Sequence, residues 1–197
     1  MSASGLLLIV SGPAGSGKTT VCASLLKKFN SIERVITATT RPSRGTEQDG
    51  IDYHFFDTQT FEDKIKNGEF YEHALVHGNR YGTLTETVRE KLSHGLDLLL
   101  NIDVQGAASF RTTALNDPLL QNHLITLFIM PPSVDELEKR LRGRATDSEA
   151  EIARRLEIAK DEMLEAPHYD HILKSDTPEA DLTALEKIYL QAKATHL

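Results

Sequence analysis

Apolar runs bounded by polar turns divide this chain into a series of strands. The clearest runs are residues 6–10, 96–103 and 124–130. A mostly apolar run of this length is typical of a strand buried between helices in a parallel sheet. Two shorter segments also predict strands, namely the β-branched residues 34–40 and a piece of 168–176.

Helices are predicted between these strands. Ser133 followed by Glu136 is a helix start signal, and Leu137 and Leu141 then lie one turn apart on the same face. Further helices are expected at residues 20–29, 61–67, 84–93, 104–114, 149–164 and 179–194. Strands that alternate with helices predict an α/β fold with a central parallel sheet.

The segment that follows residue 60 is expected to differ from this alternation. Residues 69–76 predict a strand, and residues 78–83 predict a turn before the helix at 84–93. A long loop with two arginines precedes this segment.

Length and composition favour one soluble domain. The chain has 197 residues, of which 40% are hydrophobic and 26% charged. No run approaches the roughly 18 apolar residues that span a membrane, so we expect a cytoplasmic protein without a membrane partner. The net charge of −7 argues against non-specific binding to nucleic acid.

The single cysteine, Cys22, excludes an internal disulfide and a cysteine-based metal site. We expect it to be a small core residue, with a redox role as the alternative.

A glycine-rich turn follows the first strand and is a candidate ligand-binding site. Its residues, followed by Thr20, are Gly12, Pro13, Ala14, Gly15, Ser16, Gly17, Lys18 and Thr19. A strand, this turn and a helix that opens with Lys-Thr form the phosphate loop of nucleoside triphosphate enzymes. Lys18 is expected to reach the β- and γ-phosphates, and the Thr19 hydroxyl to ligate Mg²⁺. The alternative is a glycine-rich turn without a ligand.

Two arginines, Arg41 and Arg44, lie three residues apart on the loop after the second predicted strand. Such a pair suits the capture of a phosphate by paired guanidinium groups. From composition alone, a solvated charged loop remains the alternative.

Asn101 and Asp103 lie two residues apart at the end of the strand predicted at 96–103. Side chains two apart on a strand share a face, and ligands collect at the carboxyl ends of parallel strands. Asp103 is therefore the candidate carboxylate for Mg²⁺, directly or through a water. Its alternative role is to cap the following helix.

Five arginines gather in residues 140–155 of an otherwise acidic chain: Arg140, Arg142, Arg144, Arg154 and Arg155. Arginines can stabilise the charge that is spread over a transferring phosphoryl group. These arginines are therefore candidates for stabilising such a charge.

Together these motifs resemble the guanylate kinase family over most of the chain, from about Leu6 to Ala192. The most specific string surrounds the two arginines and comprises Thr39, Thr40, Arg41, Arg44, Gly45, Glu47, Gly50 and Asp52-Tyr53-His54-Phe55. The resemblance implies a P-loop kinase fold with a core (1–36, 84–142 and 166–197), a mainly β GMP-binding lobe (37–83) and a helical, arginine-rich lid (143–165).

The resemblance also implies roles for individual residues. Glu72 would read the guanine base, helped by Thr37 and Thr83, with Asn101 near the nucleotide. The GMP phosphate would be held by Arg41, Arg44, Tyr53 and Tyr81. Lys18, Arg140, Arg144 and Arg155 would be catalytic, whereas Arg142 and Arg154 would be surface charges. Taken without the family, Glu72 is an ordinary solvated strand residue.

The implied reaction is Mg²⁺-dependent phosphoryl transfer from ATP to GMP, in a monomer or homodimer, with dGMP as a second acceptor. Two alternatives are a binding module of this fold that has lost the chemistry and a kinase for a phosphorylated ribose or another nucleotide. The chain departs from the family pattern at four positions, namely the placement of Pro42, and Asn101, Ala145 and Ser175.

Overall fold

Five parallel strands form the main sheet in this computed structural model, which describes residues 5–76, 78–143 and 148–195. Their order across the sheet is β2-β7-β1-β8-β9. The bounds are β1 Leu7–Ser11, β2 Ile32–Arg34, β7 Asp97–Asn101, β8 Leu124–Met130 and β9 His171–Lys174. The apolar run of β1 is central, because Leu7 is in register with Leu98 of β7 and with Leu124 of β8. The predicted α/β fold is confirmed.

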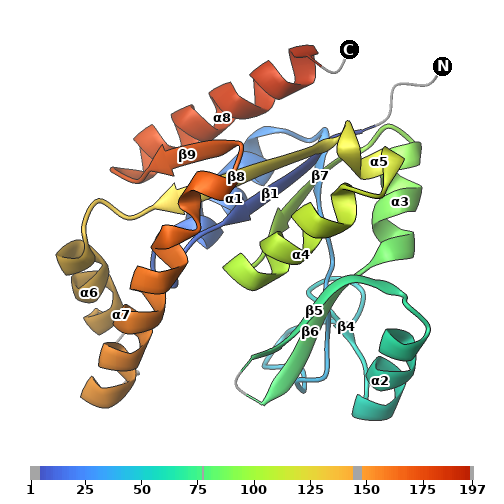
Figure 1. The fold of residues 1–197 in the computed structure, drawn as a ribbon, viewed down its shortest axis with the longest axis horizontal. Helices are drawn as coiled ribbons and strands as arrows, with labels where there is room; N and C mark the ends of the chain where they lie inside the picture. Colours follow the sequence, from blue (N-terminus) through green and yellow to red (C-terminus); the bar gives the residue numbers. More distant parts are fainter. Residues whose placement is uncertain (1–4, 77, 144–147, 196–197) are drawn as a thin grey trace.

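Helices cover both faces of this sheet (Figure 1), and the alternation of side chains along β1 explains why. Leu7 and Ile9 pack with α3 (Thr85–Ser93), α4 (Val104–Ala114) and the short α5 (Pro118–Gln121). Leu8 and Val10 pack with α1 (Lys18–Lys28) and α8 (Pro178–Thr195). A strand that is apolar at every position is thereby buried on both sides.

Cys22 lies in the second of these clusters, on α1. Burial raises the pKa of its thiol to about 12, as expected of a core residue.

A second sheet, in the order β4-β3-β6-β5, forms a separate lobe. Its strands are β3 Ala38–Thr39, β4 His54–Phe55, β5 Phe70–Val76 and β6 Asn79–Leu84. The helix α2 (Thr58–Lys66) covers it, and the Phe61 ring stacks on Phe70 at 4.5 Å. Two sequence predictions were wrong here. Residues 34–40 do not form one strand, because β2 ends in the main sheet and β3 begins in the lobe, and residues 78–83 pair with β5 as a strand instead of a turn.

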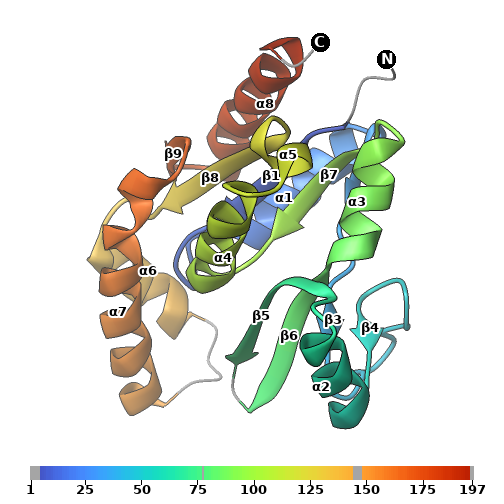
Figure 2. The same cartoon turned by 45° about the vertical axis from the view of Figure 1, so that its right-hand side comes forward.

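The helices α6 (Val134–Arg142) and α7 (Glu149–Leu164) form a hairpin on the same side of the main sheet as the lobe (Figure 2). Ser133 and Ser148 cap them by accepting hydrogen bonds from the Glu136 and Glu151 amides. Leu137 and Leu141 of α6 pack with Ile152 and Ala159 of α7 in a small cluster of their own.

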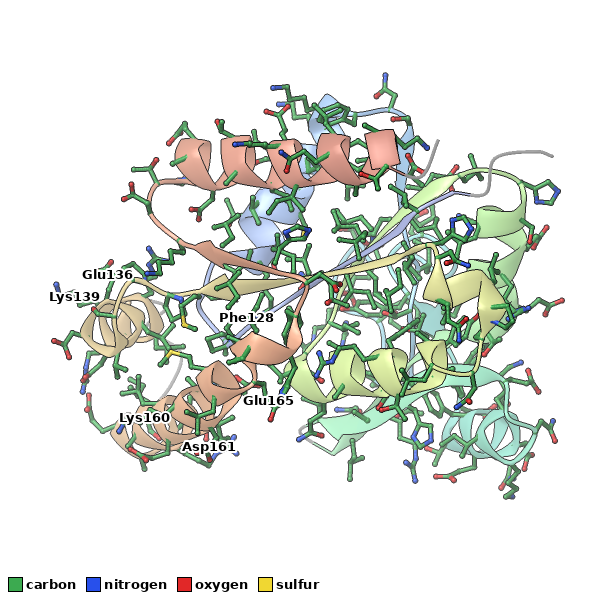
Figure 3. All side chains as sticks on the ribbon, turned by 45° about the horizontal axis from the view of Figure 1, so that its top comes forward. Phe128, Glu136, Lys139, Lys160, Asp161 and Glu165 are labelled. Atoms are coloured by element: carbon green, nitrogen blue, oxygen red, sulfur yellow. The ribbon has the colours of Figure 1, made fainter. Side chains whose placement is uncertain are left out.

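Glu165 lies at the end of α7 that joins the core, whereas Lys160 and Asp161 lie farther out along the helix (Figure 3). After α7, a single 3-10 turn (Ala166–His168) leads to β9. Within the described residues, no helix has both the length and the hydropathy required to cross a membrane.

A buried carboxylate, Asp97, lies at the amino end of β7 in the main sheet. Asp97 is 3% exposed and accepts hydrogen bonds from the Leu6 amide (2.9 Å), the Tyr189 hydroxyl (2.6 Å) and the Lys193 ammonium (2.8 Å). These contacts join the strand segments of β1 and β7 to the last helix. Because a buried charge is stable only when it is paired, this cluster ties the end of the chain to the sheet.

We expect Asp97→Ala to lower the free energy of unfolding by about 3–5 kcal/mol, because the Leu6 amide and the Lys193 charge would lose their acceptor. Lys66→Ala serves as a control, because Lys66 and its partner Asp63 are 67% and 53% exposed and such an exposed ion pair contributes about 1 kcal/mol or less. Urea unfolding measures both values. Equal, small losses for the two variants would contradict this account.

Candidate active site

The phosphate loop follows β1 and has a backbone that only glycine adopts easily. Gly12, Gly15 and Gly17 have φ angles of 138°, 88° and 100°. A Cβ atom on Gly12 would lie 2.5 Å from the Ile129 carbonyl oxygen of β8. The loop therefore needs glycine at position 12 for both conformation and space.

The amino end of α1 opens from this loop without a competing anion. Gly17 occupies its N-cap, and the first turn has no acidic residue. The Lys18 ammonium folds back over the loop and donates to the carbonyl oxygens of Gly12 (2.6 Å) and Pro13 (3.0 Å). The amides at the start of a helix and a neighbouring ammonium form a site for a phosphate group.

A cavity of about 200 Å³ lies between the lobe and the carboxyl end of β7. Five of the eight residues predicted to bind GMP line it, together with Asp103: Thr37, Tyr53, Glu72, Tyr81 and Asn101. We call it the lobe cavity. Residues far apart in the chain thus meet at one site.

Glu72 is the buried acid of the lobe cavity, and its side chain is 7% exposed. Its Oε1 accepts a hydrogen bond from the Thr83 hydroxyl at 2.7 Å. Burial raises the pKa of Glu72 to about 7, the Asp103 charge adds to the shift, and the Thr83 hydrogen bonds oppose it. Thr83 is fully buried and holds Glu72, whereas the sequence analysis expected its hydroxyl to face guanine.

The two arginines of the lobe differ in their surroundings. Arg41 is buried, forms a bidentate pair with Glu47 (2.9 Å to each oxygen) and lies over the Tyr53 ring. The hydrogen bonds that Arg41 donates to Glu47 raise the pKa of the Arg41 guanidinium. Glu47 also accepts from the Arg44 amide at 2.7 Å, but the Arg44 side chain is exposed. Of the expected guanidinium pair, the structure places Arg41 beside the cavity and Arg44 at the surface of the loop.

Asp103 caps α4, the role that the sequence analysis gave as the alternative. Its Oδ1 accepts from the Gly106 amide at 2.8 Å, and β7 ends before it, at Asn101. Its carboxylate also lines the lobe cavity. The Asn101 amide donates to the Thr19 hydroxyl at 3.3 Å, which joins the lobe cavity to the phosphate loop.

The α6–α7 hairpin lines two further cavities beside the phosphate loop. One, of about 350 Å³, is lined by Arg140, Ser175 and the loop residues Gly15, Gly17 and Thr20. The other, of about 380 Å³, lies under α7 and is lined by Ala14, Asp103, Arg155 and Glu162, among others. We call it the hairpin cavity.

The predicted catalytic arginines are therefore distributed around the loop. Arg140 donates to the Ser175 hydroxyl at 3.4 Å, and Arg155 pairs with Glu151 at 3.0 Å. Arg154 is 52% exposed and pairs with Glu151, as expected of a surface charge, and it also lines the hairpin cavity. Arg144 and Ala145 lie outside the described residues.

Glu162 is a site residue that sequence reasoning missed. It projects from α7 into the hairpin cavity, where burial and the charge of Asp103 raise its pKa to about 7, while Lys18 opposes that shift. In the sequence it resembles any polar residue of an acidic helix. Only the packing of α7 over the phosphate loop distinguishes it.

A phosphate loop on a parallel sheet, with a β-rich lobe and a helical hairpin on either side of the loop, defines the class of P-loop nucleoside monophosphate kinases. The guanylate kinase family model matches residues 4–192. The chain belongs to the guanylate kinase family.

Individual relatives are similar over nearly the whole chain. The guanylate kinase of Syntrophotalea carbinolica is 44% identical over 91% of this chain and 83% of its own length. That of Paramagnetospirillum magneticum is 41% identical over 95% and 85%. The crystal structure of guanylate kinase from Anaplasma phagocytophilum has a TM-score of 0.73 at 32% identity and covers 97% of this chain and 87% of that chain.

We expect Gly12→Ala to disturb the loop more than Gly17→Ala. Both variants incur the strain of a left-handed backbone, about 1–2 kcal/mol, but a Cβ at position 17 has nothing within 4 Å. Thermal unfolding and ATP affinity of the two variants measure the difference. Equal effects would mean that the contact with Ile129 is unimportant.

Proposed function

We infer that this protein transfers the γ-phosphoryl group of ATP to GMP and gives ADP and GDP. The observation that carries this conclusion is the buried Glu72 carboxylate in the wall of the lobe cavity, which the Asn101–Thr19 contact joins to the phosphate loop. The family to which the chain belongs supports the same reaction. We propose dGMP as a second acceptor.

Glu72 would select guanine because its carboxylate can accept hydrogen bonds from guanine N1–H and the exocyclic amine. Adenine has a bare acceptor at N1 and lacks that amine, so Glu72 would remain buried and unpaired. Sites of this kind discriminate by about 10⁴ to 10⁵. Thr83 supports the role by fixing one carboxylate oxygen at 2.7 Å, and Thr37 and Asn101 line the same cavity.

The GMP phosphate would lie near Arg41, Tyr53 and Tyr81. The rings of Tyr53 and Tyr81 are 6.1 Å apart, and Arg41 lies over Tyr53. Because Glu47 already occupies two donors of Arg41, the phosphate would use the remaining donors or compete with Glu47. Arg44, which is exposed, would have to turn inward to take part.

The ATP phosphates would occupy the loop from Gly12 to Thr20 and the amino end of α1. Lys18 would release the carbonyl oxygens of Gly12 and Pro13 to contact the β- and γ-phosphates. Arg140, Arg155 and Arg144 would stabilise the charge on the transferring group. A phosphate oxygen of GMP is already a sufficient nucleophile, so positioning and charge stabilisation account for catalysis.

Mg²⁺ would suit the donors that the chain offers. The Thr19 hydroxyl and the Asp103 carboxylate are oxygen donors at the mouth of the phosphate loop, and only one oxygen of Asp103 is used as the cap of α4. Magnesium is usually held by one or two protein oxygens together with phosphates and water. When bound, it neutralises charge on the β- and γ-phosphates.

Several broader assignments follow from the same proposal. Residues 37–83 would act as the GMP lobe and residues 143–165 as the lid of one domain, in a cytoplasmic monomer or homodimer.

The rival function, a binding module without chemistry, predicts a damaged phosphate loop. The φ angles of Gly12, Gly15 and Gly17 and the position of Lys18 favour the enzyme.

A coupled assay of ADP release across GMP, AMP, UMP and CMP tests the function. We expect turnover with GMP and, with AMP, an activity lower by about 10⁴.

Glu72→Gln should reduce GMP use at least tenfold, because the new amide presents a donor to a guanine donor, and should leave the KM for ATP unchanged. Equal turnover of AMP and GMP, or unaltered GMP kinetics in the variant, would refute the assignment.

GMP binding is expected to depend on pH through Glu72. Its pKa of about 7 means that the carboxyl is mostly protonated at pH 6, whereas guanine requires the ionised form. GMP should therefore bind about tenfold more weakly at pH 6 than at pH 8, with proton release on binding. The GMP phosphate also titrates, so Glu72→Gln is the control that retains only that contribution. Calorimetry in two buffers measures the released protons, and identical release in both proteins would contradict the prediction.

A further inference from the structure

Gly106 occupies the first turn of α4, where the helical backbone does not require glycine. It lies within Val104–Ala114, and its backbone is helical and outside the left-handed region that favours glycine. Glycine inside a helix is less favourable than alanine by about 1 kcal/mol. The surroundings of Gly106 must therefore explain why a side chain is absent there.

Those surroundings are the Glu72 carboxylate and one isoleucine. A Cβ atom on Gly106 would lie 3.1 Å from Glu72 Oε2, 3.4 Å from Glu72 Cδ and 3.2 Å from Ile102 Cδ1. The first and last of these distances are shorter than ordinary van der Waals contact. One of the two neighbours would have to move if position 106 carried a methyl group.

Glu72 cannot move away by shifting its strand. The preceding residue, Tyr71, packs against the Phe110 ring of α4 at 5.1 Å and donates from its hydroxyl to Asp117 at 3.1 Å. Thr83 holds the other oxygen of Glu72. A displaced carboxylate would therefore have to rotate about its own side-chain bonds, which changes its direction in the lobe cavity.

We propose that Gly106 is a positioning residue for guanine selectivity: its bare Cα lets the Glu72 carboxylate lie against the first turn of α4, in the direction that guanine requires. The inference rests on the proposed base-reading role of Glu72. The same residue donates its amide to Asp103 at 2.8 Å. The first turn of α4 thus leaves space for the Glu72 carboxylate and also donates a backbone hydrogen bond to Asp103.

The test is Gly106→Ala, with KM and kcat measured separately for GMP and ATP. A misplacement of about 1 Å can cost about a hundredfold, and the close contact requires a smaller movement, so we expect the KM for GMP to rise by about three- to tenfold. The KM for ATP should stay within about twofold, and the melting temperature should be unchanged or higher because alanine favours the helix. Ser109→Ala, an exposed change on the same helix, should alter none of these values.

Two double variants separate a contact with Glu72 from a contact with Ile102. Gly106→Ala with Ile102→Val removes the δ-methyl group, and we expect the GMP defect to persist. Gly106→Ala in the Glu72→Gln background should add little to the defect of Glu72→Gln alone, because both changes act through one carboxylate.

Different results overturn different claims. Normal GMP kinetics in Gly106→Ala, restoration by Ile102→Val, equal losses for ATP and GMP, or a lower melting temperature would each refute the positioning role. If Glu72→Gln itself leaves GMP use intact, the proposed function of Glu72 fails instead.

Discussion

The rest of this structure depends on one constraint, namely that the carboxyl ends of the parallel strands lie together at one end of the sheet. The phosphate loop follows the carboxyl end of β1, and Asn101 and Asp103 lie at the carboxyl end of β7. These ends are neighbours because the two strands pair in parallel, with Leu7 opposite Leu98. Helices on both faces bury β1 completely, which places this strand in the interior of the sheet. The two proposed substrates would therefore meet where strand ends, loop amides and the start of α4 lie together.

The lobe cavity contains a buried acid. Glu72 lies in a poorly solvated position that raises its pKa to about 7, with one hydrogen bond from Thr83. Such a carboxylate is stabilised when a ligand supplies N–H donors and is left unpaired when it does not. Arg41 is in the opposite situation, because Glu47 already neutralises it inside the protein. Within the described part of the chain, Glu72 thus has no ion-pair partner, whereas Arg41 is already paired.

The lobe and the hairpin are attached to the core in different ways. Tyr71 anchors β5 in the main core beside Phe110, directly before Glu72. The α6–α7 hairpin instead has a small apolar cluster of its own, and Glu165 at the base of α7 pairs with Arg111 of α4 at 3.7 Å. Glu72 therefore follows a residue that is anchored in the main core, whereas most of α7 extends beyond that core (Figure 3).

The sequence by itself determined most of the helices and strands of the main sheet and the phosphate loop. Residues 104–114, 124–130 and 149–164 have the bounds that were predicted, because apolar periodicity and helix caps act over a few residues. It did not determine which distant segments touch. The strand β6, the exposure of Arg44, the cap formed by Asp103 and the contact of Gly106 with Glu72 depend on how the lobe and α4 pack together. Local side-chain pattern sets local conformation, whereas the direction and pKa of a site residue are set by neighbours that only the folded chain brings near it.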